Sequence, residues 1–246
     1  MTTATDFDQY AESYDDALSS ALAASGEDRE YFARGRVLWL AECLRWMNET
    51  PSAVMDYGCG TGSTTPLMRE ILGAQTAVGV DVSLRSLEMA RKNQAREEIR
   101  FLSVRQYAPR QALDLAYCNG VFHHIPPQGR RQALQYIYDS LRPGGLFAFW
   151  ENNPWNPATR YVMAHCAFDN HASTLNAPQA KQFLRAGGFE ILRTDFLFIF
   201  PRILRWLRGI ERLASRLPLG AQYQVLCRKP MNAESSRPTS LRGAAS

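Results

Sequence analysis

Three closely spaced glycines near the first quarter of the chain limit its fold more than any other feature. Residues 53–57 are mostly apolar, as in a buried strand, and Gly58, Gly60 and Gly62 follow directly. Glycines at alternate positions let the backbone turn tightly and come close to a ligand. The helical pattern at 64–72 would point its first amide groups at the same ligand. Together these features predict a nucleotide-like binding site between a strand and a helix.

Strand and helix patterns alternate along most of the chain. Mostly apolar runs predict strands at 53–57, 76–80, 99–104, 113–118, 146–150, 189–198 and 223–227. Helical patterns fall at 29–47, 64–72, 84–96, 130–141 and 178–186. Such alternation predicts an α/β, Rossmann-like fold, with a seven-stranded, mostly parallel sheet and helices on both faces.

The bulk properties favour one cytoplasmic domain. The chain has 246 residues, which suits a single α/β domain with additions. Its five cysteines are odd in number and include no Cys-x-x-Cys pair, so we expect a reducing compartment. No signal-peptide pattern is visible, and no apolar run reaches the roughly 18 residues that span a membrane. The net charge of +4 is too small to indicate a nucleic-acid partner.

A carboxylate after the second predicted strand supports a ribose-containing ligand. Asp81 stands where it can accept hydrogen bonds from both ribose hydroxyls. NAD is one candidate, but its fingerprint needs a third glycine where this chain has Ser63. Asp56 beside the turn would also repel a pyrophosphate, whereas it would attract the sulfonium or amino group of S-adenosylmethionine. The charge near the loop therefore favours S-adenosylmethionine.

These residues resemble the class I S-adenosylmethionine-dependent methyltransferases. The motif in 56–62 is similar to the glycine motif of that family, and Asp81 matches its ribose-binding acid. Three later stretches resemble its fourth strand, the loop after it and the turn into its fifth strand: 113–116, 119–125 and 141–146. The resemblance implies an antiparallel last strand in the sheet.

The resemblance also implies how the chain is divided. Residues 1–48 are expected to form an N-terminal helical lid, and 49–230 the S-adenosylmethionine-binding methyltransferase domain, with a helical insertion at about 200–220. Residues 231–246 are polar and lack an apolar pattern, so we expect a disordered tail.

A set of cofactor contacts follows from the same resemblance. The expected binding residues are Asp56, Gly58, Gly60, Gly62, Asp81, Val82, Gln106 and Asn119. Gln106 stands where the family often has an acid, and its amide can still bond the adenine edge. Asn119 is expected at the methionine part. No metal is expected, because the spacing of His165, Cys166, Asp169 and His171 fits no common metal site.

The expected reaction is methyl transfer to a small-molecule or lipid-like acceptor. The methyl group is already electrophilic, so the protein has to align the acceptor and take a proton where needed. His124 is the candidate general base ahead of His123, and a packing role stays open for both. A histidine base favours oxygen as the acceptor atom. Residues 118–121 lack the Asn-Pro-Pro-Tyr stretch of base-modifying enzymes, which argues against nucleic acid. A catalytically silent binding or assembly protein is the alternative, although the glycine loop is intact.

Two polar or amphipathic segments leave their roles open. Glu151, Asn152 and the polar residues after them either orient a substrate or form a turn. Residues 200–218 have helical spacing, with apolar residues on one face and five arginines on the other. Such a helix can lie peripherally on the inner membrane surface, or pack its apolar stripe on the domain or on a partner while the arginines are solvated. The sequence leaves the oligomeric state open.

Overall fold

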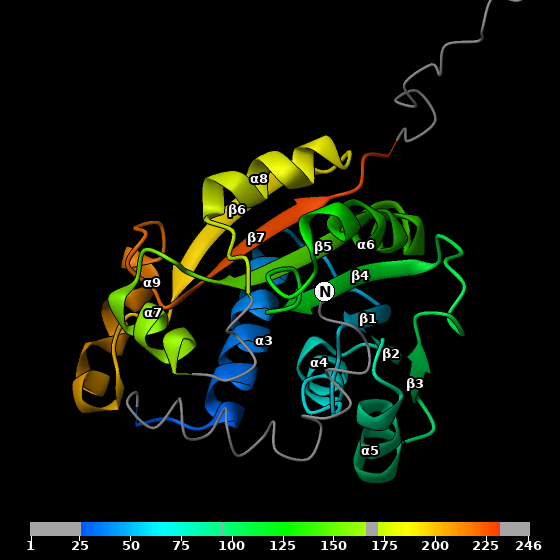
Figure 1. Ribbon diagram of the computed structural model, residues 1–246, viewed down its shortest axis with the longest axis horizontal. Coiled ribbons are helices and arrows are strands. Elements are labelled where there is room, and N and C mark those ends of the chain that lie inside the picture. Colours follow the sequence, from blue (N-terminus) through cyan, green and yellow to red (C-terminus); the bar gives the residue numbers. More distant parts are fainter. Residues whose placement is uncertain (1–25, 95, 166–171, 232–246) are drawn as a thin grey trace, which may run out of the picture.

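A seven-stranded sheet forms the centre of the computed structural model, which describes residues 26–94, 96–165 and 172–231. Its strands are β1 (Ala53–Tyr57), β2 (Thr76–Asp81), β3 (Ile99–Ser103), β4 (Leu113–Asn119), β5 (Leu141–Asn152), β6 (Glu190–Leu197) and β7 (Gln222–Arg228). They lie in the order β3-β2-β1-β4-β5-β7-β6 (Figure 1). β7 is antiparallel to its neighbours β5 and β6, and the other pairs are parallel. The predicted fold class, including the antiparallel last strand, is confirmed.

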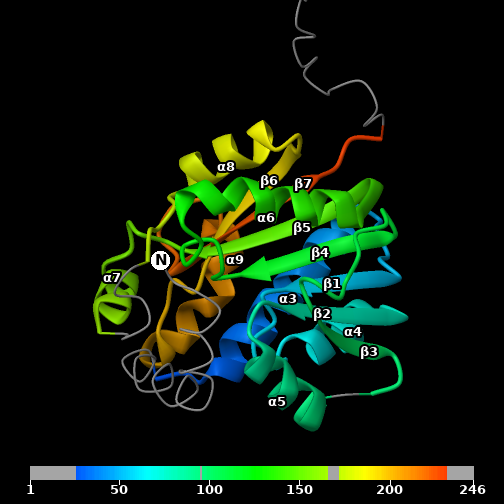
Figure 2. The same ribbon diagram turned by 45° about the vertical axis from the view of Figure 1, so that its right-hand side comes forward.

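The helices cover both faces of this sheet, as Figure 2 shows. α3 (Arg29–Trp46), α4 (Thr65–Leu72) and α5 (Leu84–Gln94) lie on one face, and α6 (Pro127–Ser140) and α8 (Ala177–Ala186) on the other. Two separate apolar clusters result, one on each face. The central strands are buried by both clusters, which explains why their sequences are continuous apolar runs rather than alternating patterns.

The segment after β6 differs from the predicted insertion helix. It forms a 3₁₀ helix, η3 (Arg202–Ile210), followed by the four-residue α9 (Glu211–Ala214), with non-helical backbone at Leu204. A 3₁₀ helix places residues three apart on one side. Arg202 and Arg208 share such a side and reach the start of α3, where they contact the Gly26 carbonyl and the Glu27 carboxylate. These two contacts join the segment to the residues just before α3.

The two sides of this segment bear on the two predicted arrangements: packing of the apolar stripe on the domain is disfavoured, and contact with a membrane surface or a partner stays a prediction. Its apolar side chains face solvent: Ile203, Trp206 and Leu213 are 84%, 74% and 87% exposed. Arginines expected in solvent instead form ion pairs with acids on other elements, Arg212 with Glu42 at 2.7 Å and Arg216 with Asp195 at 3.5 Å. The apolar stripe does not pack on the described part of this chain.

A short helix, α7 (Pro157–Ala164), follows the polar segment after β5 and was not expected. Asn156 caps it by accepting a hydrogen bond from the Thr159 amide at 3.0 Å. Asn153, the residue expected in a turn, is buried and donates to the carbonyls of Pro218 and Gly220. These asparagines therefore fasten α7 to the segment that precedes β7.

Candidate functional site

One cavity of about 860 Å³ lies at the carboxyl ends of the parallel strands. Ligands bind at this edge in folds of this kind, where the strand order reverses direction. The reversal here falls between β1 and β4, which are neighbours in the sheet. Small-molecule sites span about 300–1,000 Å³, so this volume can hold a cofactor and an acceptor together. Five of the eight predicted cofactor residues line it: Gly58, Gly60, Asp81, Val82 and Asn119.

Asp81 fastens the glycine loop to the second strand. Its Oδ2 accepts a hydrogen bond from the Gly60 amide at 2.8 Å, and its Oδ1 accepts one from the Ser83 amide at 2.9 Å. A carboxylate oxygen has two acceptor sites, and hydroxyl groups of a ligand are suitable donors to such an oxygen. Both oxygens are thereby held in fixed directions at the cavity wall. This arrangement suits a ribose with two adjacent hydroxyls.

Two glycines give the loop its shape. Gly58 and Gly60 have φ values of +75° and +53°, in the left-handed region that favours glycine. A Cβ at Gly58 would lie 2.2 Å from a Val121 side-chain carbon, so the loop after β4 passes directly over it. A Cβ at Gly60 would meet nothing within 4 Å, and its backbone faces the open cavity. The ligand can therefore approach the main chain at Gly60.

Asn119 supplies an independent sign that a polar ligand belongs here. Its Oδ1 is buried and has no hydrogen-bond partner among the described residues. A buried acceptor without a partner costs about 1–3 kcal/mol, and such atoms in native proteins call for an explanation. Asn119 stands at the end of β4 and lines the cavity. The α-amino group of S-adenosylmethionine would supply the missing donor, so these residues fit the cofactor.

Three of the expected cofactor residues lie behind or beside the cavity wall instead of in it. Asp56 is buried and accepts a hydrogen bond from the Thr65 hydroxyl at 2.8 Å. Burial raises the pKa of Asp56 to about 7, although the Thr65 bond acts in the opposite direction. Gly62 packs against Phe101 instead. The Gln106 side chain is exposed and accepts from the Ser103 amide at 3.0 Å, which turns it away from a ligand.

Val104 provides the wall at the end of the third strand, where Gln106 was expected. Its apolar side chain can pack against an adenine ring but cannot read its polar edge. The geometry therefore disfavours direct contact between the cofactor and Asp56, Gly62 or Gln106. Asp56 can still act on a cationic ligand through its charge, since it lies beside the loop.

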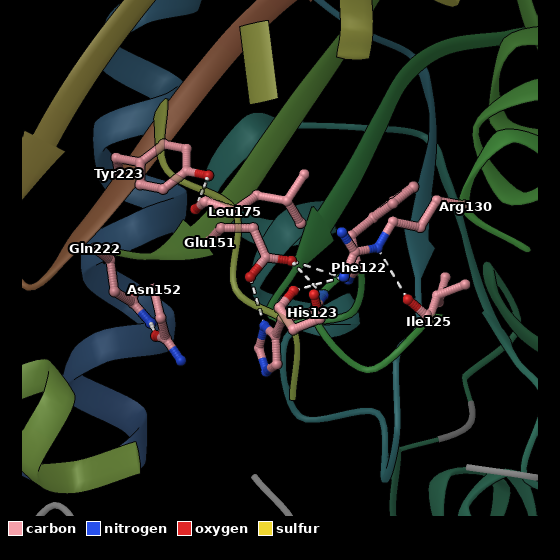
Figure 3. Close-up of polar contacts among 10 residues, drawn as sticks. Phe122, His123, Ile125, Arg130, Glu151, Asn152, Leu175, Gln222 and Tyr223 are labelled. Atoms are coloured by element: carbon pink, nitrogen blue, oxygen red, sulfur yellow. Dashed lines mark hydrogen bonds and ion pairs between the residues drawn. The ribbon is translucent and has the colours of Figure 1, made fainter. Parts of the chain in front are cut away.

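A buried carboxylate and imidazole stand beside the cofactor end of the cavity (Figure 3). Glu151 Oε2 lies 2.5 Å from His123 Nδ1, with the side chains 1% and 3% exposed. Glu151 Oε1 accepts from the backbone amides of Phe122 at 2.9 Å and His123 at 3.3 Å. The His124 ring lies against that of His123, with centroids 4.1 Å apart. Both histidines line the cavity.

The loop that carries these histidines is held from several sides. Arg130 donates to the carbonyls of Ile125 at 2.9 Å and Ser173 at 2.5 Å (the first contact is drawn in Figure 3). The Ser173 amide in turn donates to the His123 carbonyl at 2.8 Å. Glu151 completes the set through the two amides described above. A catalytic group in such a loop is pre-positioned, because its side chain and backbone lose little conformational freedom when a substrate binds.

The far wall of the cavity is aromatic. Tyr31, Phe32 and Phe198 form one edge-to-face group, with ring centroids 4.9 to 6.0 Å apart. Phe198 has φ +63°, which bulky residues rarely adopt and which the surrounding structure must enforce. Its ring lies over Gly35 of α3, where an added Cβ would be 2.8 Å from Cε1.

Arginines interrupt this aromatic wall. Arg208 lies over the Tyr31 ring at 4.6 Å and pairs with Glu27. Arg36 is buried and donates to the Tyr117 hydroxyl and to Gln222, both at 2.9 Å. The acceptor end therefore combines apolar surface with two arginines, of which Arg208 is paired with Glu27. Sequence patterns could not bring these residues together, because they come from opposite ends of the chain.

Of the four residues that the sequence raised as possible metal ligands, the structure describes His165 alone. Cys166, Asp169 and His171 lie outside the described residues, and His165 Nδ1 donates to the Tyr161 carbonyl at 2.8 Å. Within 26–94, 96–165 and 172–231, no three His, Cys, Asp or Glu side chains are grouped as a metal site requires. Direct metal ligation therefore has no support in the described part of the chain.

The fold, the glycine loop and Asp81 define a methyltransferase. A family model described as "Methyltransferase domain" matches residues 54–145, which contain the loop, Asp81 and both histidines. The family match, the curated relatives and the shared fold support a class I S-adenosylmethionine-dependent methyltransferase family for this chain.

Its curated relatives include several enzymes named trans-aconitate 2-methyltransferase. The one from Variovorax paradoxus is 26% identical over 205 residues, which are 75% of this chain and 78% of that protein. The one from Methylobacterium radiotolerans is 29% identical over 131 residues, or 53% and 50% of the two chains. The one from an Azoarcus strain is 34% identical over 97 residues, or 39% and 38%. The last two matches thus span half or less of those relatives.

Solved structures share the fold at low identity. A methyltransferase from Mesorhizobium loti has a TM-score of 0.56 and 21% identity, covering 76% of this chain and 96% of that one. A 1,6-didemethyltoxoflavin N1-methyltransferase from Burkholderia thailandensis, solved with that substrate and S-adenosylhomocysteine, has a TM-score of 0.54 and 21% identity. It covers 89% of this chain and 90% of the other. Sequence identities this low show the fold alone. The identity of the acceptor has to be inferred from the cavity of this chain.

Proposed function

We propose that this chain methylates a hydroxyl oxygen of a small acceptor that has an apolar body and an anionic group. The observation that carries this proposal is the cavity itself, which runs from the cofactor loop past the two histidines to the aromatic wall. Tyr31, Phe32 and Phe198 suit an apolar or lipid-like body. Arg36 and Arg208 suit an anionic group at the same end.

The residues of this chain would divide the work as follows. Asp81 and Asn119 would hold the ribose and amino groups of S-adenosylmethionine, which supplies an electrophilic methyl group when bound. The aromatic wall would set the acceptor's position, and one of the adjacent histidines would take its proton. The sequence favours His124 for that role. Residues 26–48 supply Tyr31 and Phe32 to the wall, which supports the predicted lid, although residues 1–25 lie outside the described part.

The acceptor class can be tested with a methyl-labelled cofactor. Deuteromethyl S-adenosylmethionine would be incubated with the protein and with paired acceptors, phenols with and without a carboxylate, and trans-aconitate. Mass spectrometry of the products would locate the label. Labelled phenol ethers, formed faster from the carboxylated phenols, are expected. Methyl esters of trans-aconitate alone would refute hydroxyl transfer, and a well-folded protein that binds no cofactor would favour the silent binding protein.

A second proposal concerns the exposed apolar residues of 200–218, which we propose contact a membrane surface peripherally. Ile203, Trp206 and Leu213 face solvent on the segment that also borders the cavity through Arg208. Among the described residues, no helix has the length and apolar character needed to cross a bilayer. Contact would therefore be made by shallow burial of these side chains, with nearby arginines at the headgroups.

Vesicle binding would test this contact. Sedimentation with phosphatidylcholine vesicles, with and without phosphatidylglycerol, is expected to remove wild type but not a Trp206→Ser, Leu213→Ser variant from solution. Leu192→Ser, at an apolar residue 39% exposed on β6, is the matched control. Light scattering would show whether a dimer forms instead. A dimer that the double variant dissociates would refute the membrane proposal.

A further inference from the structure

The contact between Glu151 and His123 determines which imidazole nitrogen carries the proton. Glu151 Oε2 lies 2.5 Å from Nδ1, and a carboxylate can only accept. Nδ1 therefore donates, and the lone pair of the neutral ring is on Nε2. Figure 3 shows the imidazole below Glu151, with its second nitrogen on the side away from the carboxylate. This is the arrangement of a base that takes a proton at Nε2.

Glu151 is placed for this contact by the sheet and not by a flexible loop. It is the second-last residue of β5 and is paired with Tyr223 of β7 in the antiparallel ladder. The same carboxylate fixes the backbone of its partner through the Phe122 and His123 amides. Carboxylate, backbone and ring thus form one rigid unit at the cavity wall.

Four charged or titratable side chains lie around this unit. Arg130 of α6 lies close enough to Glu151 for their charges to interact, as do Tyr223 of β7 and Cys118 of β4. Burial raises the pKa of both Tyr223 and Cys118 well above the usual values, so both are neutral near pH 7. His124 lies against the ring itself. Arg130 is the cation of this group that can support a negative Glu151.

We propose that His123 is the proton acceptor of the reaction and that Glu151 is the residue that positions it. The assignment rests on the proposed transfer to a hydroxyl oxygen, and it differs from the His124 that the sequence favours. In the step, the acceptor oxygen forms a bond to the methyl carbon. The carbon–sulfur bond breaks with its electron pair left on sulfur, and the hydroxyl proton passes to Nε2. The imidazolium so formed is balanced by the Glu151 carboxylate.

The first test needs no acceptor. Nitrogen-15 NMR of protein saturated with S-adenosylhomocysteine would report the tautomer and titration of each histidine, assigned with His123→Gln and His124→Gln. We expect an Nδ1–H tautomer for His123 in wild type. In Glu151→Gln we expect a mixed tautomer and loss of the ring proton at a lower pH. An Nε2–H tautomer in wild type, or identical titration in Glu151→Gln, would overturn the proposal.

The second test separates a catalytic from a structural role. With 4-hydroxyphenylacetate as acceptor, a phenol that carries the proposed anionic group, His123→Gln is expected to lower kcat for ether formation by about 10²–10⁴-fold, and His124→Gln by less than tenfold. Cofactor Kd should stay within threefold in both. Glu151→Gln should lower kcat and move the acid limb of the pH–rate profile to lower pH, since the amide no longer favours the imidazolium.

Equal activity of His123→Gln and wild type would overturn the assignment. If trans-aconitate is methylated and the hydroxyl of 4-hydroxyphenylacetate is not, the hydroxyl function fails, and unchanged kcat of His123→Gln on trans-aconitate would overturn the base as well. If neither compound is methylated, the NMR result decides whether the pair is built as proposed. Circular dichroism and cofactor binding would show that each variant is folded.

Discussion

Replacing Asp81 by asparagine should weaken cofactor binding by an amount that the structure allows us to estimate. The carboxylate accepts one backbone bond at each oxygen and can accept one ribose hydroxyl at each. Asparagine keeps one acceptor oxygen and puts an amino group in place of the other. At least one charge-assisted bond to the ribose is then lost, at about 1.5–3 kcal/mol. That energy corresponds to roughly a 10- to 150-fold rise in Kd.

The same change acts on the unliganded protein. Its amino group would face either the Gly60 or the Ser83 amide, and two donors cannot bond each other. We therefore expect a lower Tm as well as weaker binding. Isothermal titration with S-adenosylhomocysteine would measure Kd, with Asp139→Asn at the exposed end of α6 as the matched control. A Kd within threefold of wild type, in a variant with normal circular dichroism, would refute the role given to Asp81.

Three further perturbations follow from the described contacts. Burial raises the pKa of Asp56 to about 7, so a sulfonium bound nearby should lower that pKa and release a proton. Calorimetric titrations with S-adenosylmethionine at pH 7, in buffers of different ionisation enthalpy, should detect this proton release. Asp56→Asn should abolish it. Gly35→Ala should displace the Phe198 ring and raise the acceptor KM severalfold while leaving cofactor Kd unchanged, as calorimetry would show. Asp114 has a lowered pKa because, against burial, the bond from Arg142 and two amides favour its charged form. Asp114→Asn should lower the free energy of unfolding by about 1 kcal/mol at pH 7, and denaturant titrations should show this difference vanish as the pH falls below 4.

The cofactor half of the site was predictable from sequence because its geometry is local. The turn after β1 joins adjacent elements, and the parallel sheet brings Asp81 and Asn119 to the same edge. The positions of the predicted strands along the sequence are therefore enough to place most of the cofactor residues. Gln106 is the exception at this level: its position after β3 was predicted, but its side chain bonds to the Ser103 backbone amide instead.

The acceptor half could not be predicted, since long-range contacts create it. Glu151 reaches His123 across 28 residues, and Arg36 reaches Gln222 across 186. No periodicity in the sequence encodes such pairings. The arginine-rich segment shows the same limit: helical spacing indicated two faces, but it did not indicate that the arginines pair with Glu27, Glu42 and Asp195.

These ion pairs have a consequence for the exchange of acceptor specificity between relatives. The cavity's far wall is assembled from 26–42 and 198–216, two pieces that flank the matched methyltransferase segment and hold each other through Arg208 with Glu27 and Arg212 with Glu42. A chimera that receives one piece without the other would bring unmatched charges together. Recombination that changes the acceptor should therefore succeed only when both pieces move as a set, leaving the cofactor segment between them untouched.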